Sequence, residues 1–429
     1  MKLKTLVCLS LITLVASLAL AQHHPILTGS VRSGTGGDGL IDWAQYNFDP
    51  AHDGYNPYET ILGPTTVGNV TLQWSYQALE GPVQSTPAVV GGVVYVGAGT
   101  GYMGAHFAVY ALNAETGDFL WKYVTSGYTF GAPAVANGVV YVVGGNVYAL
   151  GANTGALIWQ SQLSNCAFSP TLVDAVLYVV CGRSTVYAMN PETGTIIWAF
   201  STGGRILSSP AVANGALYVS SGDESVYALD AGTGALIWQR RLGRSLSIPA
   251  TLDTYPGSQA VANGVLYVGV ERTGPENPHD LYALDAATGA IHWRTTLDSA
   301  LSTPAVANGT VYVGSDSRVY ALDASTGTIA WQYLIPDDFS AASPIIANGV
   351  LYVPTVRCCG FGVGFYTLVA LDADTGTLVW DYATGISEAG NVASPAVVNG
   401  VIYGYDNGLF GAFGLPSPSQ PAGALPHYR

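Results

Sequence analysis

Short runs of β-branched and aromatic residues alternate with turn residues along almost the whole chain. In residues 211–219, for example, Asn214-Gly215 separates two short apolar stretches. An Asn-Gly pair in this setting favours a type I′ turn, whose twist matches that of the flanking strands. Further pairs begin at Asn137, Asn263, Asn308, Asn348 and Asn399, and Gly91-Gly92 and Asp174-Ala175 occupy the equivalent places. The pattern therefore predicts a β-hairpin at eight positions along the chain.

A second pattern, AxDxxTGxxxW, follows most of these hairpins. It occurs seven times with small drifts, at residues 111–121, 149–159, 188–198, 228–238, 283–293, 321–331 and 370–380. The Asp side chain can bind a local backbone N–H, and the Gly permits a positive φ, so we expect a tight turn at each TG pair. The Trp that follows begins a further strand.

Together the two patterns define one repeating unit of four strands, A to D. A tight turn joins A to B, a loop joins B to C, and the TG turn joins C to D. The Trp residues of unextended units lie 38 to 40 residues apart. Because a single four-stranded sheet cannot bury both of its faces, such units must pack radially, as in a β-propeller.

The eighth unit is split between the two ends of the chain. Residues 391–413 supply strands A, B and C, but no TG turn or Trp follows them. Residues 70–76, with Trp74, have the spacing of a D strand. The sequence therefore predicts an all-β, eight-bladed propeller of four-stranded antiparallel blades, closed by N- and C-terminal strands in the last blade, which removes an open edge. The docking residues between blades are predicted to be Trp74, Trp121, Trp159, Trp198, Trp238, Trp293, Trp331 and Trp380.

The AxDxxTGxxxW motif and the segment from Asp42 to Trp74 resemble those of the pyrroloquinoline quinone (PQQ) repeat superfamily of eight-bladed propellers. The resemblance covers residues 42–413, nearly the whole mature chain. It implies the fold more firmly than the function. The superfamily includes quinoprotein alcohol dehydrogenases and non-catalytic propellers such as the outer-membrane assembly lipoprotein.

In the dehydrogenases that this family includes, PQQ lies between a Trp and a vicinal disulfide, beside a Ca²⁺ held by Glu and Asn, and an Asp acts as base. Here eight of nine Trp are docking residues, and Trp43 lies in the N-terminal arm. The pair Cys358-Cys359 lies in the B–C loop of blade 7 rather than on the way into a strand A. No CxxCH haem site is present. The catalytic residues of the family are therefore not assigned to this chain.

The N-terminus has the features of an export signal. Lys2 and Lys4 precede the apolar run Leu6–Leu20, and Ala19-Leu20-Ala21 is a small-x-small cleavage site. We therefore expect a signal peptide at 1–21, an arm at 22–69, the propeller at 70–414 and a disordered, Pro- and Ser-rich tail at 415–429. The alternative is a membrane anchor, but the apolar run is short for a span. The mature protein is predicted to be secreted or periplasmic, with no transmembrane segment.

The charge of the chain limits its partners. The formal net charge is −14, and only 10% of residues are charged. Such a surface repels phosphate groups, which argues against nucleic acids and anionic membranes as partners. A protein or a glycan remains as the expected partner.

Four cysteines remain after removal of the signal peptide, and an even number in an exported protein favours disulfides. Pairing of Val173 with Val176 would place Phe168 opposite Cys181 and Cys166 diagonally from it. We therefore predict a Cys166–Cys181 disulfide near the limit of disulfide geometry.

Insertions single out one face of the predicted propeller. Blades 1, 5 and 7 are extended between strands B and C, at about 99–106, 271–280 and 355–366. B–C loops and D–A connections emerge on the same face, so we expect the binding site there. Neutral drift of surface loops is the alternative explanation.

The candidate site residues belong to this face. Cys358-Cys359, next to Arg357, can form a strained eight-membered disulfide ring that offers a platform to a planar quinone or a sugar. The alternative is two reduced or separately paired thiols. Arg244 and Arg272 can bind a carboxylate or a sugar acid. Carboxylate oxygens are suitable Ca²⁺ ligands, so a metal site formed by Glu271 and Asp298 is a further hypothesis. Solvated strand ends would also explain these charges.

These observations favour an exported, non-catalytic propeller that binds a protein or glycan through its B–C face. The alternative is a PQQ- and Ca²⁺-dependent dehydrogenase of alcohols or sugars. The sequence leaves open whether the protein is an enzyme, which cofactor it holds, and its oligomeric state.

Overall fold

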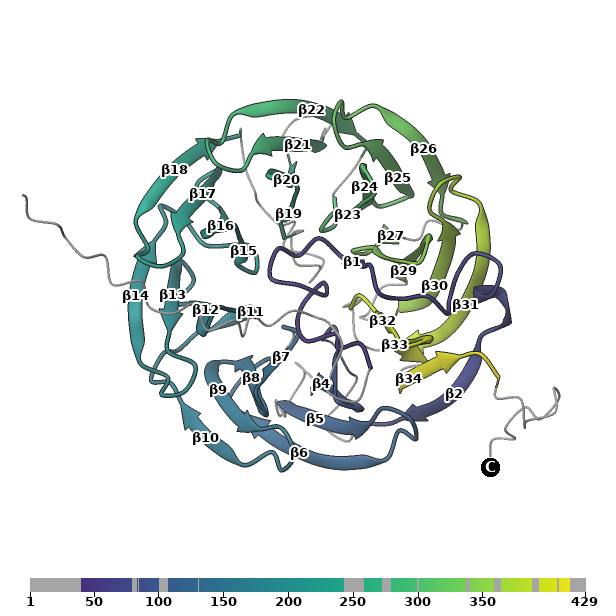
Figure 1. The fold of residues 1–429 in the computed structure, drawn as a ribbon, viewed down its shortest axis with the longest axis horizontal. Helices are drawn as coiled ribbons and strands as arrows, with labels where there is room; N and C mark the ends of the chain where they lie inside the picture. The colour runs from purple at the N-terminus through teal and green to yellow at the C-terminus, as the bar shows by residue number, and fades with distance from the viewer. Residues whose placement is uncertain are drawn as a thin grey trace, which may run out of the picture.

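The protein is described by a computed structural model, which covers residues 40–78, 83, 85–99, 107–129, 131–242, 258–271, 279–298, 301–336, 340–358, 364–387, 393–406 and 409–416. Within these ranges the strands form eight sheets arranged in a closed ring (Figure 1). The predicted eight-bladed propeller is confirmed. Among the same residues, no helix has the length and apolar character needed to cross a membrane. The predicted signal peptide at 1–21 and most of the predicted tail lie outside the described residues.

Each blade has the predicted order A-B-C-D from the channel outward, with antiparallel neighbours. The A strands are β3 (Ala88–Val90), β7 (Ala134–Ala136), β11 (Ala167–Val173), β15 (Ala211–Ala213), β19 (Ala260–Ala262), β23 (Ala305–Ala307), β28 (Ile345–Ala347) and β32 (Ala396–Val398). The B strands are β4 (Val93–Gly99), β8 (Val139–Gly144), β12 (Val176–Cys181), β16 (Ala216–Ser221), β20 (Val265–Glu271), β24 (Thr310–Gly314), β29 (Val350–Cys358) and β33 (Val401–Asp406).

The C and D strands complete each sheet. The C strands are β5 (Phe107–Asn113), β9 (Asn146–Gly151), β13 (Thr185–Met189), β17 (Ser225–Asp230), β21 (His279–Asp285), β25 (Arg318–Asp323), β30 (Gly364–Asp372) and β34 (Leu409–Gly414). The D strands are β6 (Phe119–Thr125), β10 (Leu157–Gln160), β14 (Ile196–Ser201), β18 (Leu236–Arg241), β22 (Ile291–Leu297), β26 (Ile329–Leu334), β31 (Leu378–Ser387) and β2 (Thr71–Tyr76). Three short elements lie outside this pattern: β1 (Tyr55–Asn56) pairs in parallel with β28, β27 (Ser340–Ala341) pairs with β29, and the 3-10 helix η1 (Val67–Asn69) precedes β2.

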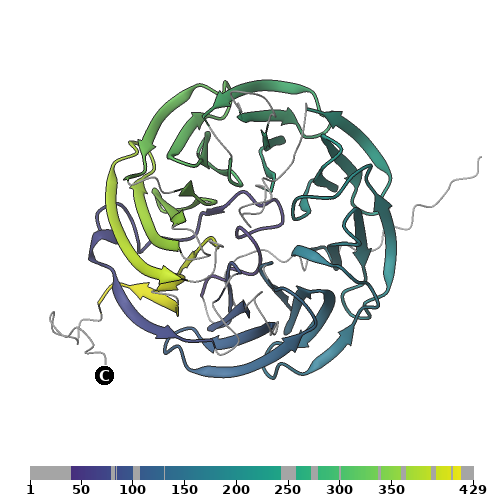
Figure 2. The same ribbon diagram turned by 180° about the vertical axis from the view of Figure 1, so that it is seen from behind.

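The two ends of the chain close the ring in blade 8. The N-terminal strand β2 is antiparallel to the last strand β34, with Trp74 opposite Ala412 and Tyr76 opposite Phe410. Figure 2 shows the same closure from behind, where the purple strand lies beside the yellow one. The predicted pairing of the Trp74 strand with the Phe410 strand is therefore confirmed.

The core lies between adjacent blades rather than at one centre. The B and C strands carry alternating large side chains that pack against the next sheet, as Tyr218 of blade 4 does with Leu266 and Tyr282 of blade 5. The D strands are instead half exposed. Burial of apolar side chains therefore holds neighbouring blades together. Because the ring is closed, every blade has a neighbour on both of its faces.

Tryptophan docking is confirmed at seven blade junctions within the described residues. In each, the indole N–H donates to a carbonyl in the TG turn of the next blade, and the ring lies over the Gly of that turn. The pairs are Trp74–Ala114, Trp121–Ala152, Trp159–Pro191, Trp198–Ala231, Trp238–Ala286, Trp293–Ala324 and Trp331–Ala373. Trp380 faces blade 8, which has no TG turn, and packs on Phe413 and Tyr382 instead.

The predicted Cys166–Cys181 disulfide is present, but the predicted register is wrong. Val173 does lie opposite Val176, yet the register shifts between Ala167 and Thr171. Phe168 has a φ of +70° in this irregular stretch. Ala167 therefore lies opposite Val180, which brings Cys166 directly across from Cys181 rather than diagonally.

Candidate functional site

The N-terminal arm does not lie on the outside of the propeller: it crosses the central channel, as both ribbon views show (Figures 1 and 2). Residues 43–56 contact the A strand of every blade in order around the ring. The contacts are Trp43–Val89, Ala44–Val135, Gln45–Leu172, Pro50–Val212, Ala51–Val261, Asp53–Val306, Gly54–Ile346 and Asn56–Val397. We call this segment the plug.

The blade residue in each contact occupies an equivalent position near the middle of its A strand. In blades 4 to 7, its N–H donates to a plug carbonyl over 2.7–2.9 Å. The inner edge of a propeller blade has no neighbouring strand, so these N–H groups would otherwise need water as acceptor. The plug supplies the missing acceptors, which fixes its path around the channel.

The plug changes direction sharply, and its sequence explains how. Asn47, Phe48, His52 and Gly54 have positive φ values, between 49° and 77°. Asn and Gly adopt this region readily, whereas Phe48 does so at a cost. Phe48 is nevertheless buried, with its ring edge-on to that of Trp43 at 5.2 Å between centroids. Packing of these two rings anchors the start of the plug.

A belt of hydroxyl groups surrounds the plug where the A strands begin. The N–H of one belt residue donates to the hydroxyl of the next blade's residue, from Ala132 to Ser169, Ser209, Ser258, Thr303 and Ser343 in turn, over 2.7–3.1 Å. These bonds join A strands that belong to separate sheets. These belt residues, each of which directly precedes a Pro except Ser258, which precedes Gln259, thus tie neighbouring blades together around the axis.

Tyr46 reaches from the plug into this belt. Its hydroxyl lies 3.0 Å from that of Thr303. Ser258 and Ser343 also lie close to it, and burial raises the pKa of Tyr46. The plug and the belt thus form one polar centre on the propeller axis.

His52 is held in a defined tautomer at this centre. The Thr171 hydroxyl donates its only proton to the Pro210 carbonyl at 2.5 Å, so it must accept from Nε2 of His52 at 3.3 Å. Nδ1 of His52 is then unprotonated, and no group of the described residues donates to it. Burial lowers the pKa of His52 to about 3, so the ring stays neutral. Both polar atoms of the buried Asn47 side chain also lack a hydrogen-bond partner within the described ranges. These atoms require water or a small polar ligand on the axis.

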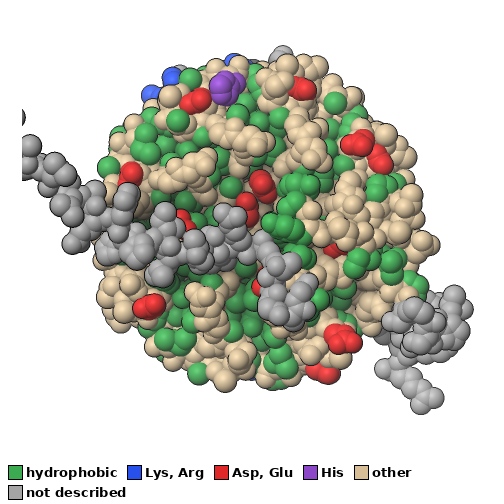
Figure 3. Space-filling model, in the orientation of Figure 1, with side chains coloured by type: hydrophobic (Ala, Val, Ile, Leu, Met, Phe, Trp, Pro, Cys, Tyr) green, Lys and Arg blue, Asp and Glu red, His purple; other side chains and the backbone are tan. Residues whose placement is uncertain are grey.

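Two carboxyl groups complete the plug. Asp49 and Asp53 lie deep in the molecule, although part of their surface remains accessible. Burial raises the pKa of Asp49 to about 6. Burial and the nearby charge of Asp49 raise the pKa of Asp53 to about 8. The face shown in Figure 3 carries acidic atoms near its middle, with basic side chains visible only at its rim.

The described part of the structure places none of the predicted binding residues at this centre. Cys359, Arg244 and Arg272 fall outside the described residues. Arg357 and Cys358 end β29, opposite Phe365 and Gly364, and only their backbone is described. The platform formed by the cysteine pair thus stays a prediction.

The predicted metal ligands are also separate from the plug. Glu271 ends β20 opposite His279, with only its backbone described. Asp298 forms an ion pair with Arg318. Within the described ranges, no three His, Cys, Asp or Glu side chains come together in an arrangement that could hold a metal ion.

Exposed arginines do gather at the B–C face of blades 3 and 4. Arg183 is in the B–C turn of blade 3, with a φ of +74°, and its carbonyl accepts the N–H of Ile206. Arg205 precedes Ile206, so the two arginines are neighbours on this surface, and both are exposed. Arg241 is paired with Glu224 in the turn of blade 4.

The described residues do not provide the PQQ site of the dehydrogenases. All nine Trp lie in the described ranges, and eight of them are on D strands at the outer side of the blades. Trp43 is nearest the axis but is fully buried among core residues, so it offers no free ring face. The plug itself occupies the inner edges of the A strands. A planar cofactor therefore has no stacking Trp here.

Sequence comparison with known proteins agrees with this architecture. A family model described as outer membrane protein assembly factor BamB matches residues 68–165, 143–269 and 233–404, which together make up most of the chain. Tetrathionate hydrolase from Acidithiobacillus ferrooxidans is 24% identical over 184 residues, 33% of this chain and 37% of that protein. Quinohemoprotein alcohol dehydrogenase ADH-IIG from Pseudomonas putida is 27% identical over 227 residues, 47% of this chain and 31% of that protein. The chain thus spans well under half the length of either curated relative.

Structural comparison shows the shared fold. The crystal structure of BamB from Moraxella catarrhalis has a TM-score of 0.60 and 19% identity, covering 80% of this chain and 99% of that one.

Proposed function

Because the chain belongs to the family of outer membrane protein assembly factor BamB, we propose that it is an exported, non-catalytic propeller that binds a protein or glycan through its B–C face. One observation carries the proposal: the plug contacts all eight A strands and fills the inner side of the ring. The channel centre is therefore occupied by the chain itself, which leaves the outer faces for a partner.

The two faces differ in what they offer. The segment that follows the plug lies against the A–B turns, where Gly63 is close to Asn348 and Ile61 to Gly400. The B–C face carries the exposed Arg183 and Arg205, and we expect the three insertions between strands B and C on the same side. Arginines bind carboxylates in a bidentate manner, so this face suits an acidic partner group. We include Arg244, Arg272, Arg357 and the pair Cys358-Cys359 in the proposed surface.

An exported location fits a buried disulfide, because disulfides persist in oxidising compartments. We propose that the mature protein starts at Gln22 and resides in the periplasm or outside the cell. Intact-mass measurement of the exported protein tests this; a mass that includes residues 1–21 contradicts it.

Site-specific photocrosslinking in the producing cell tests the proposed surface. A photoreactive amino acid is placed at Arg183 or Arg205 on the B–C face, and at Asn214 or Asn308 in the A–B turns as matched exposed controls. We expect adducts of defined mass from the first pair of positions. Adducts only from the control positions, or equal adducts from all four, would contradict the proposal. Protease and glycosidase digestion of the adduct distinguishes a protein from a glycan.

A PQQ- and Ca²⁺-dependent dehydrogenase is the second candidate, because part of the chain matches a quinohemoprotein alcohol dehydrogenase. Purified protein incubated with PQQ and Ca²⁺ tests it. We expect no cofactor absorbance after gel filtration and no dye reduction with a panel of alcohols and sugars. Retained absorbance together with substrate-dependent dye reduction would favour the dehydrogenase.

A further inference from the structure

Four consecutive contacts of the plug come from one short turn, residues 49–54. The carbonyls of Pro50, Ala51, Asp53 and Gly54 accept the N–H groups of blades 4, 5, 6 and 7. The attachment of the plug to half of the ring therefore depends on the conformation of this turn, which we call the acidic turn.

Two carboxyl groups set that conformation. Oδ1 of Asp49 accepts the N–H of Asp53 at 3.4 Å, and the Asp49 carbonyl accepts the N–H of His52 at 3.2 Å. Oδ1 of Asp53 accepts the N–H of Tyr55 at 3.0 Å. Both side chains thus hold the backbone that presents the four carbonyls to the blades.

Among the residues that the structure describes, no Lys or Arg side chain pairs with either carboxyl. The A strands that face the acidic turn, β15, β19, β23 and β28, consist of Ala, Val and Ile only. The titratable neighbours on the plug are Tyr46, Tyr55 and His52, and the His52 ring is neutral. Two ionised carboxylates at this depth would repel each other, and among the described residues only backbone N–H groups offset their charges. Burial raises the pKa of both Asp49 and Asp53, and the nearby charge of Asp49 raises that of Asp53 further.

We propose that the plug is a proton-controlled closure of the channel: the Asp49–Asp53 pair holds the acidic turn against blades 4 to 7 while it carries a proton, and releases it when both carboxyls ionise. The pair acts as a unit, because the charge state of one carboxyl sets that of the other. Release frees the inner-edge N–H groups of Val212, Val261, Val306 and Ile346. The channel side of blades 4 to 7 then becomes open to solvent and to an extended polypeptide chain.

The direction of the pH dependence follows from linkage. In the released arm the carboxyls are hydrated and titrate near the ordinary value of about 4. In the docked arm they titrate at about 6 and about 8, so the docked state binds more protons between pH 4 and pH 8. Burial of neutral His52, whose pKa is lowered to about 3, acts in the opposite direction, because a released His52 gains a proton below its ordinary pKa of about 6.5. With this opposing effect included, docking is strongest near pH 4 and weakens as the pH rises through about 6 and about 8.

Hydrogen exchange of the full mature chain, read by mass spectrometry, tests the proposal. Exchange is followed from pH 5.5 to pH 9 and corrected for the intrinsic rate of each peptide. We expect the protection of residues 43–56 and of β15, β19, β23 and β28 to fall at least about tenfold, since one pKa unit corresponds to about a tenfold change in the equilibrium. Peptides from the B and C strands should keep their protection. Constant or increasing protection of the plug with rising pH would overturn the proposal.

Three variants locate the effect. Asp53→Asn keeps the acceptor oxygen but cannot ionise, so its plug should stay protected up to pH 9. Asp49→Asn should behave similarly and serves if Asp53→Asn does not fold. Glu115→Gln changes an exposed carboxyl in a TG turn and should keep the wild-type response. An unchanged pH response in both Asn variants would show that the pair does not control the plug. Because the readout is exchange in the free protein, failure of partner binding at the B–C face leaves this test unaffected.

Discussion

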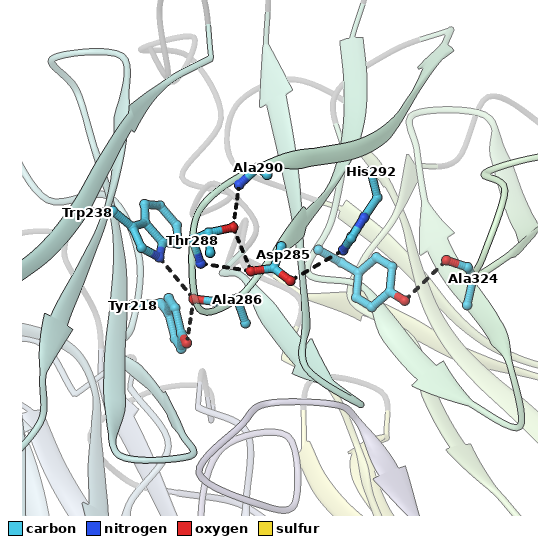
Figure 4. A network of polar contacts seen from close by, with 9 residues as sticks. Tyr218, Trp238, Asp285, Ala286, Thr288, Ala290, His292 and Ala324 are labelled. Carbon is cyan, nitrogen blue, oxygen red and sulfur yellow. Dashed lines mark hydrogen bonds and ion pairs between the residues drawn. The ribbon is translucent and has the colours of Figure 1, made fainter.

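The indole N–H of Trp238 donates a 3.0 Å hydrogen bond to the main-chain carbonyl of Ala286 on the next blade (Figure 4). The hydroxyl of Tyr218 donates to the same carbonyl, also over 3.0 Å. The Asp285 side chain holds the turn that presents this carbonyl, through the N–H and the hydroxyl of Thr288. In this arrangement, one carbonyl oxygen of a blade accepts hydrogen bonds from two side chains of the neighbouring blade. We call it the joint, and it repeats around the ring.

The tyrosine of this joint provides a matched pair of variants. Tyr352 occupies the position of Tyr218 in blade 7, but blade 8 has no TG turn, and the buried Tyr352 hydroxyl has no hydrogen-bond partner in the part of the chain that the structure describes. Tyr218→Phe should lower the free energy of unfolding by about 1 kcal/mol, because it removes a hydrogen bond. Tyr352→Phe should leave stability unchanged or raise it, because it removes an unsatisfied buried group. Urea denaturation measures both; a larger loss for Tyr352→Phe would contradict the assignment.

The glycine under the docked ring is a second test of the joint. A Cβ at Gly289 would lie 2.8 Å from the Trp238 ring, whereas one at Gly215 would contact nothing, and both residues have positive φ values of 68° and 77°. Each Gly→Ala change costs about 1–2 kcal/mol from backbone strain. Gly289→Ala should cost clearly more, because it also displaces Trp238. Equal melting temperatures for the two variants would show that docking tolerates the displacement.

The disulfide of blade 3 should contribute measurably to stability. Cys166 and Cys181 are both buried and lie 15 residues apart. A loop of this length gives about 3 kcal/mol in the chain-entropy model. The double change to Ser should therefore lower the melting temperature of the oxidised protein, and dithiothreitol should lower that of the wild type to a similar value. Insensitivity of the wild type to reduction would contradict this prediction.

Ring closure can be tested by two deletions. Removal of residues 42–77 eliminates β2 and leaves the edge of β34 unpaired, so we expect aggregation. Removal of residues 40–56 eliminates the plug but keeps β2, and this product should stay soluble with a lower melting temperature. Size-exclusion chromatography and thermal melting compare them. A soluble, cooperatively melting 42–77 deletion would refute the closure argument.

The vicinal cysteines give the last prediction. Changing Cys358 and Cys359 together to Ser should leave the melting temperature unchanged, because the pair lies outside the repeated sequence motifs of the blades. Photocrosslinking from Arg183 should fall several-fold if the pair forms part of the binding platform. Adduct yields equal to those of the wild type would show that the two cysteines are only a feature of the loop.

The repeats made the blades predictable because their determinants are local. An Asn-Gly turn such as Asn214-Gly215 specifies a hairpin within a few residues, and the TG turn places the next strand in the same way. The split eighth blade could be identified because Trp74 has the spacing of a D strand. The register near Cys166 could not, because an irregularity at Phe168 leaves no periodic signal in the sequence.

The sequence by itself determined the number of blades, their strand order, the docking tryptophans and the closing strand, because each of these follows from a short motif that recurs at a fixed spacing. Only the tertiary structure showed that residues 43–56 fill the channel. The plug has no sequence repeat of its own. It is held mainly by hydrogen bonds to the backbone of eight distant strands, and backbone groups of this kind are present whatever the side chains are. The raised pKa values of Asp49 and Asp53 likewise depend on the tertiary structure. They arise from burial and, for Asp53, from the nearby charge of Asp49, and the side chains become buried only when the ring is closed.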